Sequence, residues 1–394
     1  MYNLTLTAEQ LEFRDTIRDF VEREIKPVAT HSSRLQPLHP PFPADLLALA
    51  APLGLRTLML TEEHGGANAD TLTACIVMEE LAAGDVDVAM AMAHTAFLAH
   101  ALFEGAMNTE QRARLLPAFT NDEHGHLAYA GTDTGGPGWQ YHRNRAAPAA
   151  RVTAVRNGGH WILNGDAGFV ANAPIAGLIA VEASAGVLIA TRGAPGLTVR
   201  VPGTDSESVI PWIIGSGGYV TFKDCSVPVD NFIAAPQTLR RTQGHSVALT
   251  AAVNLGLGRT AFEAAIAYAK LRVQGGRPII QHQAIGTKLA GIAISLEAAR
   301  NLIWKAAWAL DHPESAASLP TLPLETAARV FTAETVCEAT EKAAECFGAM
   351  GVMRDMPLQK YVHDAVKFLH ANVSSAVDMF EIGEAVAGFE SSAA

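Results

Sequence analysis

The stretch YAKLRVQGGRPIIQHQAIGTKLA, at residues 268–290, indicates the fold most clearly. A long helical pattern runs up to Arg272, and the pair Gly275-Gly276 follows it. A second helical pattern occupies residues 282–311. Paired glycines between two helical patterns are typical of a tight turn. We therefore expect two long helices joined by a short turn that carries an arginine at its start.

Outward from this stretch, the chain divides into three zones. Residues 239–394 contain four long helical patterns, at 246–272, 282–311, 322–348 and 357–385, which together favour a helical bundle. Residues 126–238 carry short alternating runs separated by turns such as Asn157-Gly158-Gly159, which favour a small β-barrel. Residues 1–125 are again helical. The sequence predicts an α+β protein of three domains: an N-terminal helical domain, a central β-barrel and a C-terminal four-helix bundle.

Local signals refine the helical zones. Thr7 and Gln10 have the spacing of a capping box, and Pro27 is expected to end the helix that starts there. An apolar helix pair is predicted over 70–105, with a break near Gly84. The segment NLGLG at 254–258 lies inside a helical pattern with no strand before it. We interpret its glycines as sites of close helix packing rather than as a dinucleotide loop.

Composition excludes several classes of protein. The net charge of -11 argues against a nucleic-acid partner, since such proteins present a concentrated basic face. The N-terminus lacks the pattern of a secretory signal, and no apolar run approaches the roughly 20 residues of a membrane span. The 4 cysteines are scattered, without metal-binding spacing. A cytoplasmic protein with no membrane association and no metal site is the expectation.

Ordered motifs over nearly the whole chain resemble those of the acyl-CoA dehydrogenase family. They are LRTLMLTEEHGGANADTLTACIVMEELAAGD at 55–85, YAGTDTGG at 129–136, HWILNGDAGFVANA at 160–173, VPVDNFI at 227–233, the stretch 268–290, and ECFGAMGVMRDMPLQKYVHDA at 345–365. The resemblance implies a flavoprotein oxidoreductase that binds FAD and acts on an acyl thioester. The carrier of the acyl group, coenzyme A or an acyl-carrier protein, stays open. The resemblance also implies a dimer or tetramer, or a hetero-oligomer with a catalytic homologue.

The resemblance assigns roles to individual residues. Arg272 is suited to a dinucleotide pyrophosphate, because its fork matches phosphate geometry, and Gln283 to the adenosine or ribose edges. In relatives these bundle residues complete the flavin site of a neighbouring subunit. The full set expected to bind the cofactor is Tyr129, Thr132, Phe169, Ala171, Arg272, Gln283, Gly348, Ala349 and Ser374. The set expected to line the substrate pocket is His94, Thr95, Ser246 and Val247.

The chain departs from the family pattern where the chemistry is carried. Removing hydrogen from an acyl thioester needs a base for the α-proton and a flavin that accepts the β-hydride. Asn372 stands in place of the usual glutamate, and an amide cannot accept that proton. Ser246 occupies the alternative position for the glutamate, and Val247 replaces an arginine that holds the coenzyme A end. Ala171 replaces a threonine that bonds the flavin edge.

The base is therefore unidentified, and several hypotheses follow. A flavoenzyme with a relocated base would use His370, Asp378 or Glu381. Alternatively, the chain is a non-catalytic companion subunit of a heteromeric dehydrogenase. Two further alternatives are a flavin-dependent hydroxylase, which needs no α-proton base, and a flavin-poor scaffold of the same fold.

Overall fold

The chain forms two compact units. The computed structural model describes residues 5–35, 42–131, 151–201, 215–233, 239, 243–316, 322–370 and 375–388. Contacts group Met1–Leu49, Asp70–Met90 and Val247–Gly388 into the first unit, and Ala50–Ala69, Ala91–Ser246 and Phe389–Ala394 into the second. The N-terminal helices thus share a unit with the C-terminal bundle. The three domains expected from sequence stay a prediction.

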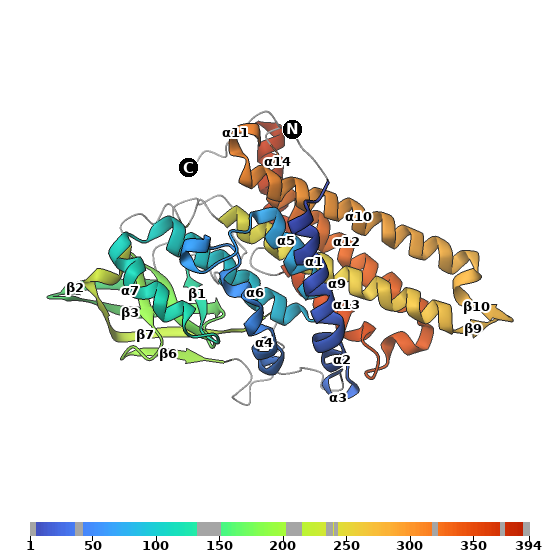
Figure 1. Cartoon of the computed structure of the whole chain (residues 1–394), viewed down its shortest axis with the longest axis horizontal. Coiled ribbons are helices and arrows are strands. Elements are labelled where there is room, and N and C mark those ends of the chain that lie inside the picture. The colour runs from blue at the N-terminus through green and yellow to red at the C-terminus, as the bar shows by residue number, and fades with distance from the viewer. Residues whose placement is uncertain are drawn as a thin grey trace. The chain divides into compact units, whose positions relative to one another are not determined.

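The first unit is helical (Figure 1). Its helices are α1 (Ala8–Phe20), η1 (Val21–Ile25), α2 (Lys26–Ala29), α3 (Ser32–Leu35), most of α4 (Ala44–Ala50), α5 (Thr71–Ala82), the start of α6 (Val86–Ala99), most of α9 (Gln243–Leu271), α10 (Gln283–Asp311), α11 (Pro313–Ala316), α12 (Leu324–Cys346), η8 (Gly348–Val352), α13 (Leu358–His370) and α14 (Ser375–Ala387). The hairpin of β9 (Val273–Gln274) and β10 (Arg277–Pro278) joins α9 to α10. The predicted helix at 357–385 corresponds to α13 and α14, and residues 371–374 between them lie outside the described residues.

Glycines let the long helices of the first unit pack closely. A Cβ on Gly256 of α9 would lie 2.3 Å from the carbonyl oxygen of Glu79 in α5. A Cβ on Gly258 would lie 2.7 Å from a side-chain carbon of Leu296 in α10 and 2.9 Å from one of Val336 in α12. Both distances are shorter than real side chains tolerate. The prediction that the glycines of 254–258 serve helix packing is therefore confirmed.

The N-terminal helix begins as predicted but does not end there. Thr7 and Gln10 form the reciprocal capping box, with bonds of 3.1 and 3.0 Å. Pro27 does not end the helical run, which continues through η1 into α2 as far as Ala29. The prediction was wrong because Pro27 lies in the first turn of α2, where a missing N–H is tolerated. The predicted break near Gly84 is confirmed between α5 and α6, where a Cβ would lie 2.8 Å from Ile25.

A buried ion network ties α5 to three other helices. Arg18 of α1 and Arg259 of α9 both donate to the Glu80 carboxylate, at 2.7 Å each. Arg300 of α10 donates to the Glu79 carboxylate at 2.8 Å. Glu79 and Glu80 are only 5% and 3% exposed. Because a buried carboxylate is costly without partners, these pairs hold α1, α9 and α10 around α5.

The second unit contains a mixed sheet (Figure 1). Its strands are β1 (His126–Ala130), β2 (Val152–Asn157), β3 (His160–Ala171), β4 (Ala176–Ala183), β5 (Gly186–Thr191), β6 (Leu197–Arg200), β7 (Gly217–Pro228) and β8 (Phe232–Ile233). The order is β6-β7-β3-β2-β4-β5-β8, with β1 paired to β4. The unit also holds the short helices η2 (Ala51–Leu53), η3 (Leu55–Thr57), η4 (Glu62–His64) and η6 (Val229–Asn231), the rest of α6, η5 (His100–Ala106) and α7 (Thr109–Thr120).

The sheet corrects the prediction of a β-barrel. Strand β1 runs parallel to β4, whereas β3 with β7 and β4 with β5 are antiparallel. Over the described strands, the path runs from β6 to β8 without pairing its ends. Alternating apolar runs predict strands but not whether a sheet closes, because closure depends on strand tilt and stagger. The helical N- and C-terminal parts and the central β-structure are as predicted.

One face of the sheet forms an apolar core. Leu163 and Val170 of β3 pack there with Ile179 and Val181 of β4 and Phe222 of β7. Successive residues of a strand point to opposite faces. Phe169 and Ala171 flank Val170, so they lie on the face away from this core.

One helical stretch differs from the sequence expectation about membranes. The continuous run Val86–Ala106 is 21 residues long and apolar enough to span a bilayer. In its most apolar window, 83% of the residues are buried inside the protein. A core helix of a water-soluble protein passes the same test of length and composition. The expectation that no run approaches this length was wrong, and the burial favours a core helix.

Candidate functional site

Phe169 packs closely against β7 on the outer face of the sheet. A Cβ on Gly217 of β7 would lie 2.0 Å from the Phe169 ring. Tyr219 meets Phe169 edge-on, with ring centroids 5.8 Å apart, and the Arg200 guanidinium lies 4.7 Å from the Tyr219 centroid. Phe169 is half-buried and Tyr219 is 38% exposed. The half-exposed aromatic surface here suits contact with a planar ring.

The end of β3 is fixed by a buried polar cluster. Asn172, with a φ of 61°, donates its amide to the Ala91 carbonyl at 2.9 Å and to the Thr95 hydroxyl at 3.2 Å. The Thr95 hydroxyl donates to the Ala91 carbonyl at 3.0 Å and lies 2.7 Å from Nδ1 of His126. Burial lowers the pKa of His126 to about 3. The ring is therefore neutral at physiological pH, and its Nδ1 shares a hydrogen bond with the Thr95 hydroxyl.

This cluster changes the interpretation of one predicted pocket residue. Thr95 is 0% exposed, and its hydroxyl is used in the interior. It holds α6 to the sheet and offers no surface to a ligand. The neighbouring His94 is half-buried, and burial lowers its pKa to about 4. Of the predicted pair, only His94 keeps an accessible side chain.

Tyr129 is held at the end of β1. Its hydroxyl donates to a Glu182 carboxylate oxygen at 2.8 Å. A Cβ on Gly131 would lie 2.7 Å from the Tyr129 ring, so this glycine allows the chain to turn past the ring. Thr132, the next predicted cofactor residue, lies outside the described residues. The partner Glu182 was not predicted.

In the first unit, the predicted cofactor residues lie on exposed turns. Arg272 is exposed directly before the β9–β10 hairpin, and Gln283 is exposed at the start of α10, after the short helix η7 (Ile279–Gln281). Gly275 and Gly276 have φ of 60° and 80°, values that favour glycine. Among the described residues, the Arg272 guanidinium has no hydrogen-bond or ion-pair partner. Its backbone is ordered: Arg272 N–H donates to the Tyr268 carbonyl at 2.9 Å and the Ile279 N–H donates to the Arg272 carbonyl at 2.8 Å.

A ring stack brings the second predicted segment to this hairpin. Tyr268, one turn before Arg272, stacks on Phe347 with centroids 4.1 Å apart and planes 14° apart. Gly348 and Ala349 follow Phe347 directly and are exposed. Gly348 has a φ of 58°, with nothing within 4 Å of where a Cβ would lie. The structure therefore places Arg272 and Gly348 in one neighbourhood of the first unit.

The candidate bases do not form a catalytic site in the described residues. Asp378 of α14 forms a buried ion pair with Arg329 of α12. Burial raises the pKa of Asp378, although Arg329 opposes the rise. Glu381 and His370 are exposed. Asn372 and Ser374 lie outside the described residues.

The start of α9 carries an unpredicted histidine. His245 precedes the half-buried Ser246 and Val247, and its ring lies 6.3 Å from that of His100. Burial lowers the pKa of His245 to about 4, with His100 adding to the effect. The sequence marks these residues only as polar positions in apolar helices. Pairing of residues so distant in the chain leaves no local pattern.

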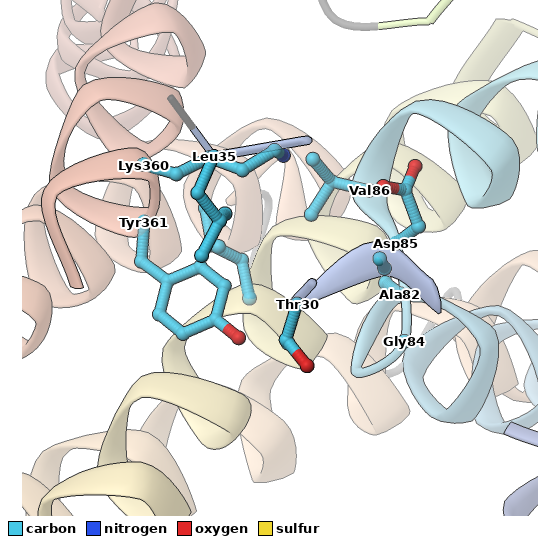
Figure 2. A pocket seen from close by; sticks show the side chains of 10 residues that line it. Thr30, Leu35, Ala82, Gly84, Asp85, Val86, Lys360 and Tyr361 are labelled. Atoms are coloured by element: carbon cyan, nitrogen blue, oxygen red, sulfur yellow. The ribbon is translucent and has the colours of Figure 1, made fainter. Parts of the chain in front are cut away.

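A small cavity in the first unit is not the substrate site. Figure 2 shows Thr30, Asp85, Lys360 and Tyr361 around it. The volume inside it that the centre of a water molecule can occupy is only about 10 Å³. This is room for one water molecule. Beside it, Lys360 and Lys367 donate to the Asp364 carboxylate at 2.6 and 2.8 Å. These charges belong to the packing of α13.

Known proteins show the same architecture. Residues 7–123 match the acyl-CoA dehydrogenase N-terminal domain, and residues 240–368 match the acyl-CoA dehydrogenase C-terminal domain. A probable acyl-CoA dehydrogenase of Mycobacterium bovis is 30% identical over 375 residues, covering 91% of this chain and 90% of that protein. The short-chain specific acyl-CoA dehydrogenase of Clostridium acetobutylicum is 27% identical over 380 residues, covering 92% and 94%.

A solved structure agrees with these relatives. The butyryl-CoA dehydrogenase of Megasphaera elsdenii superposes with a TM-score of 0.81 and 24% identity, covering 98% of this chain and 100% of that one. The fold is therefore that of the acyl-CoA dehydrogenases. The chain belongs to the acyl-CoA dehydrogenase family. Members of this family bind FAD, and the chain is an oxidoreductase of the acyl-CoA dehydrogenase type.

Proposed function

We propose that this protein binds FAD and oxidises an acyl thioester, by α,β-dehydrogenation or a related flavin-dependent oxidation, with a non-standard active site. The carrying observation is the exposed hairpin at Arg272, whose guanidinium has no partner among the described residues. Arg272 is exposed to solvent and lies beside a turn that contains two glycines. This arrangement suits the binding of a charged diphosphate better than it suits a structural role inside the protein.

The residues present fit this cofactor. Arg272 would hold the pyrophosphate of a flavin that is bound to a neighbouring subunit, and the open backbone at Gly348 allows close approach of that dinucleotide. Gln283 would hydrogen-bond the adenosine or ribose. Phe169 would pack as a hydrocarbon against the flavin ring, with Gly217 fixing its position. Tyr129, Thr132, Ala171, Ala349 and Ser374 complete the proposed set.

The cofactor supplies the acceptor for the hydride that leaves the acyl group. The chain's own task is to bind and orient the thioester and to receive a proton. Asn372 cannot receive it, and Asp378 is engaged by Arg329 in a buried pair. Ser246 and Val247 offer no carboxylate and no arginine where relatives use them.

A second function has specific support. The hairpin at Arg272 and Gln283 is complete and exposed, while Asn372, Ala171 and Val247 depart from the family pattern. This uneven loss favours a companion subunit, which completes the flavin site of a catalytic homologue. The partner is then a second chain of the same fold that carries the missing glutamate.

The flavin assignment is tested by the visible absorbance of purified protein. We expect Arg272→Ala to lower the flavin content at least several-fold, because a hydrogen bond to a charged group such as phosphate is worth about 1.5–3 kcal/mol. Arg156→Ala, which removes an exposed arginine of β2, is the matched control and should leave flavin content unchanged. Equal flavin in the wild type and in Arg272→Ala would rule out the assigned role of Arg272.

A further inference from the structure

His94 interrupts an otherwise sealed helix surface. Every residue of 88–99 except His94 is buried, including Ala93 directly before it and Thr95 directly after it. His94 alone in this stretch keeps an accessible part of its side chain. Its ring therefore lies at an opening in the packing of α6 within the second unit.

Hydrogen bonds place this opening beside the end of β3. Asn172 donates to the Ala91 carbonyl at 2.9 Å and to the Thr95 hydroxyl at 3.2 Å, so this side of α6 faces Asn172. Residues three apart on a helix share a side, and His94 lies three after Ala91. It therefore flanks the contact with Asn172, which directly follows Ala171. Phe169 and Ala171 present the outer face of the sheet at which we place the flavin.

The His94 ring has unused hydrogen-bonding capacity. Among the described residues, no side chain or backbone group pairs with its nitrogens. Burial lowers its pKa to about 4, so it is uncharged at physiological pH. A neutral imidazole offers one donor and one acceptor. Where packing shields these groups from water, leaving them unpaired is unfavourable, and a ligand that enters beside the ring and pairs with them removes that cost.

We propose that His94 hydrogen-bonds an oxygen on the acyl chain of the substrate, and so selects a hydroxylated or keto acyl thioester over the plain alkyl one. The inference rests on the proposed function, because it assigns the acyl pocket to this side of α6. A neutral ring favours a neutral hydroxyl or carbonyl over a carboxylate, since it brings no charge to a carboxylate. Thr95, His126 and Asn172 hold α6 in position.

Calorimetric titration of the FAD-loaded protein tests the proposal. The ligands are hexanoyl-CoA and its monohydroxylated analogues, one for each chain position. We expect the wild type to bind at least one hydroxylated analogue about tenfold more tightly than hexanoyl-CoA, the equivalent of one hydrogen bond. His94→Phe should abolish that preference, and His94→Gln, which keeps a donor and an acceptor, should retain part of it. His160→Phe, at an exposed histidine of β3, is the matched control and should keep the wild-type ratio.

The outcomes separate this inference from the proposed function. Flavin content is measured first by absorbance, and calorimetry then reports binding without any flavin signal. Protein that holds FAD but binds all analogues equally overturns the role of His94 and leaves the flavin assignment standing. The same ratio in the wild type and in His94→Phe overturns it as well. Failure to load FAD contradicts the proposed function itself.

Discussion

At the scale of single residues, the chain's most informative position is Asn372. The resemblance to the family places Asn372 at the position where a glutamate is expected, and an amide there would leave no proton acceptor. We expect the unmodified chain alone not to bleach its flavin with simple saturated acyl-CoA substrates. Asn372→Glu should rescue little, because productive geometry must be held within about an ångström and Val247 and Ala171 alter the surroundings. Anaerobic absorbance titration checks the unmodified chain and Asn372→Glu. Bleaching of the flavin by the unmodified chain would require a base at another position.

Thr95 gives a second prediction at this scale. Thr95→Val keeps the shape but removes the hydroxyl that His126 and Asn172 share. Buried donors left unpaired cost about 1–3 kcal/mol, so we expect the free energy of unfolding to fall by that amount in urea denaturation. Thr198→Val, at an exposed threonine of β6, is the control. A loss no larger than the control's would show that the buried bonds contribute little.

The residues predicted from the sequence lie close together in the chain, whereas the missed ones interact across long separations in the chain. Arg272, Gly275 and Gly276 lie within five positions of one another, so their spacing alone predicts a turn with a cation. Asn172 and Thr95 are 77 residues apart in the chain, and Glu182 and Tyr129 are 53 apart. A sequence without its fold does not reveal such pairs. Thr95 was predicted to line a pocket, whereas its hydrogen bonds to Asn172 and His126 were not predicted.

At the scale of elements, Asp87 of α6, which interacts with Lys360 and Asp364 of α13, makes a pH-dependent contribution to stability. Burial, opposed by Lys360 and reinforced by Asp85 and Asp364, raises the pKa of Asp87 from 3.8 to about 6. The folded state thus holds a proton that the unfolded chain has released between these values. The contribution of Asp87 to stability therefore falls as pH rises from about 4 to about 6, and stays lost above.

Asp87→Asn tests whether stability falls with rising pH, because the amide keeps the shape of the side chain and removes its ionisation. We expect the variant to gain in melting temperature relative to the wild type at pH 8, and to gain about half as much at pH 5, which lies midway between the two pKa values. Asp355→Asn, at an exposed aspartate, should show no such difference between the two pH values. A gain that is larger at pH 5, or a loss at pH 8, would show that Asp87 is stabilised as the anion by Lys360.

Elements were predicted best where local chemistry decides them. The capping box at Thr7 and the break at Gly84 depend on neighbouring residues and are confirmed. Pro27 was misinterpreted because a proline ends one helix or begins the next with the same local pattern. The closure of the β-sheet was misinterpreted because it depends on strand stagger across the whole sheet.

At the scale of the whole molecule, exposed apolar side chains indicate assembly. In the first unit Leu271 is 82% exposed, Ile294 71% and Val352 75%. Side chains of this kind favour an interface when they share one surface, because contiguous apolar patches are typically covered by a partner. We expect a dimer or tetramer by light scattering at micromolar concentration, and a smaller species for Ile294→Asp. A monomeric wild type would contradict the assembly, and with it a flavin site shared between chains.

FAD binding by this chain is the property on which the other proposals depend. The most direct measurement is the visible spectrum of the purified wild-type protein after incubation with excess FAD and removal of the unbound cofactor. We predict stoichiometric FAD that stays with the protein, alone or together with a catalytic homologue. Protein that remains colourless under both conditions would contradict it, and would leave a flavin-free scaffold of the same fold.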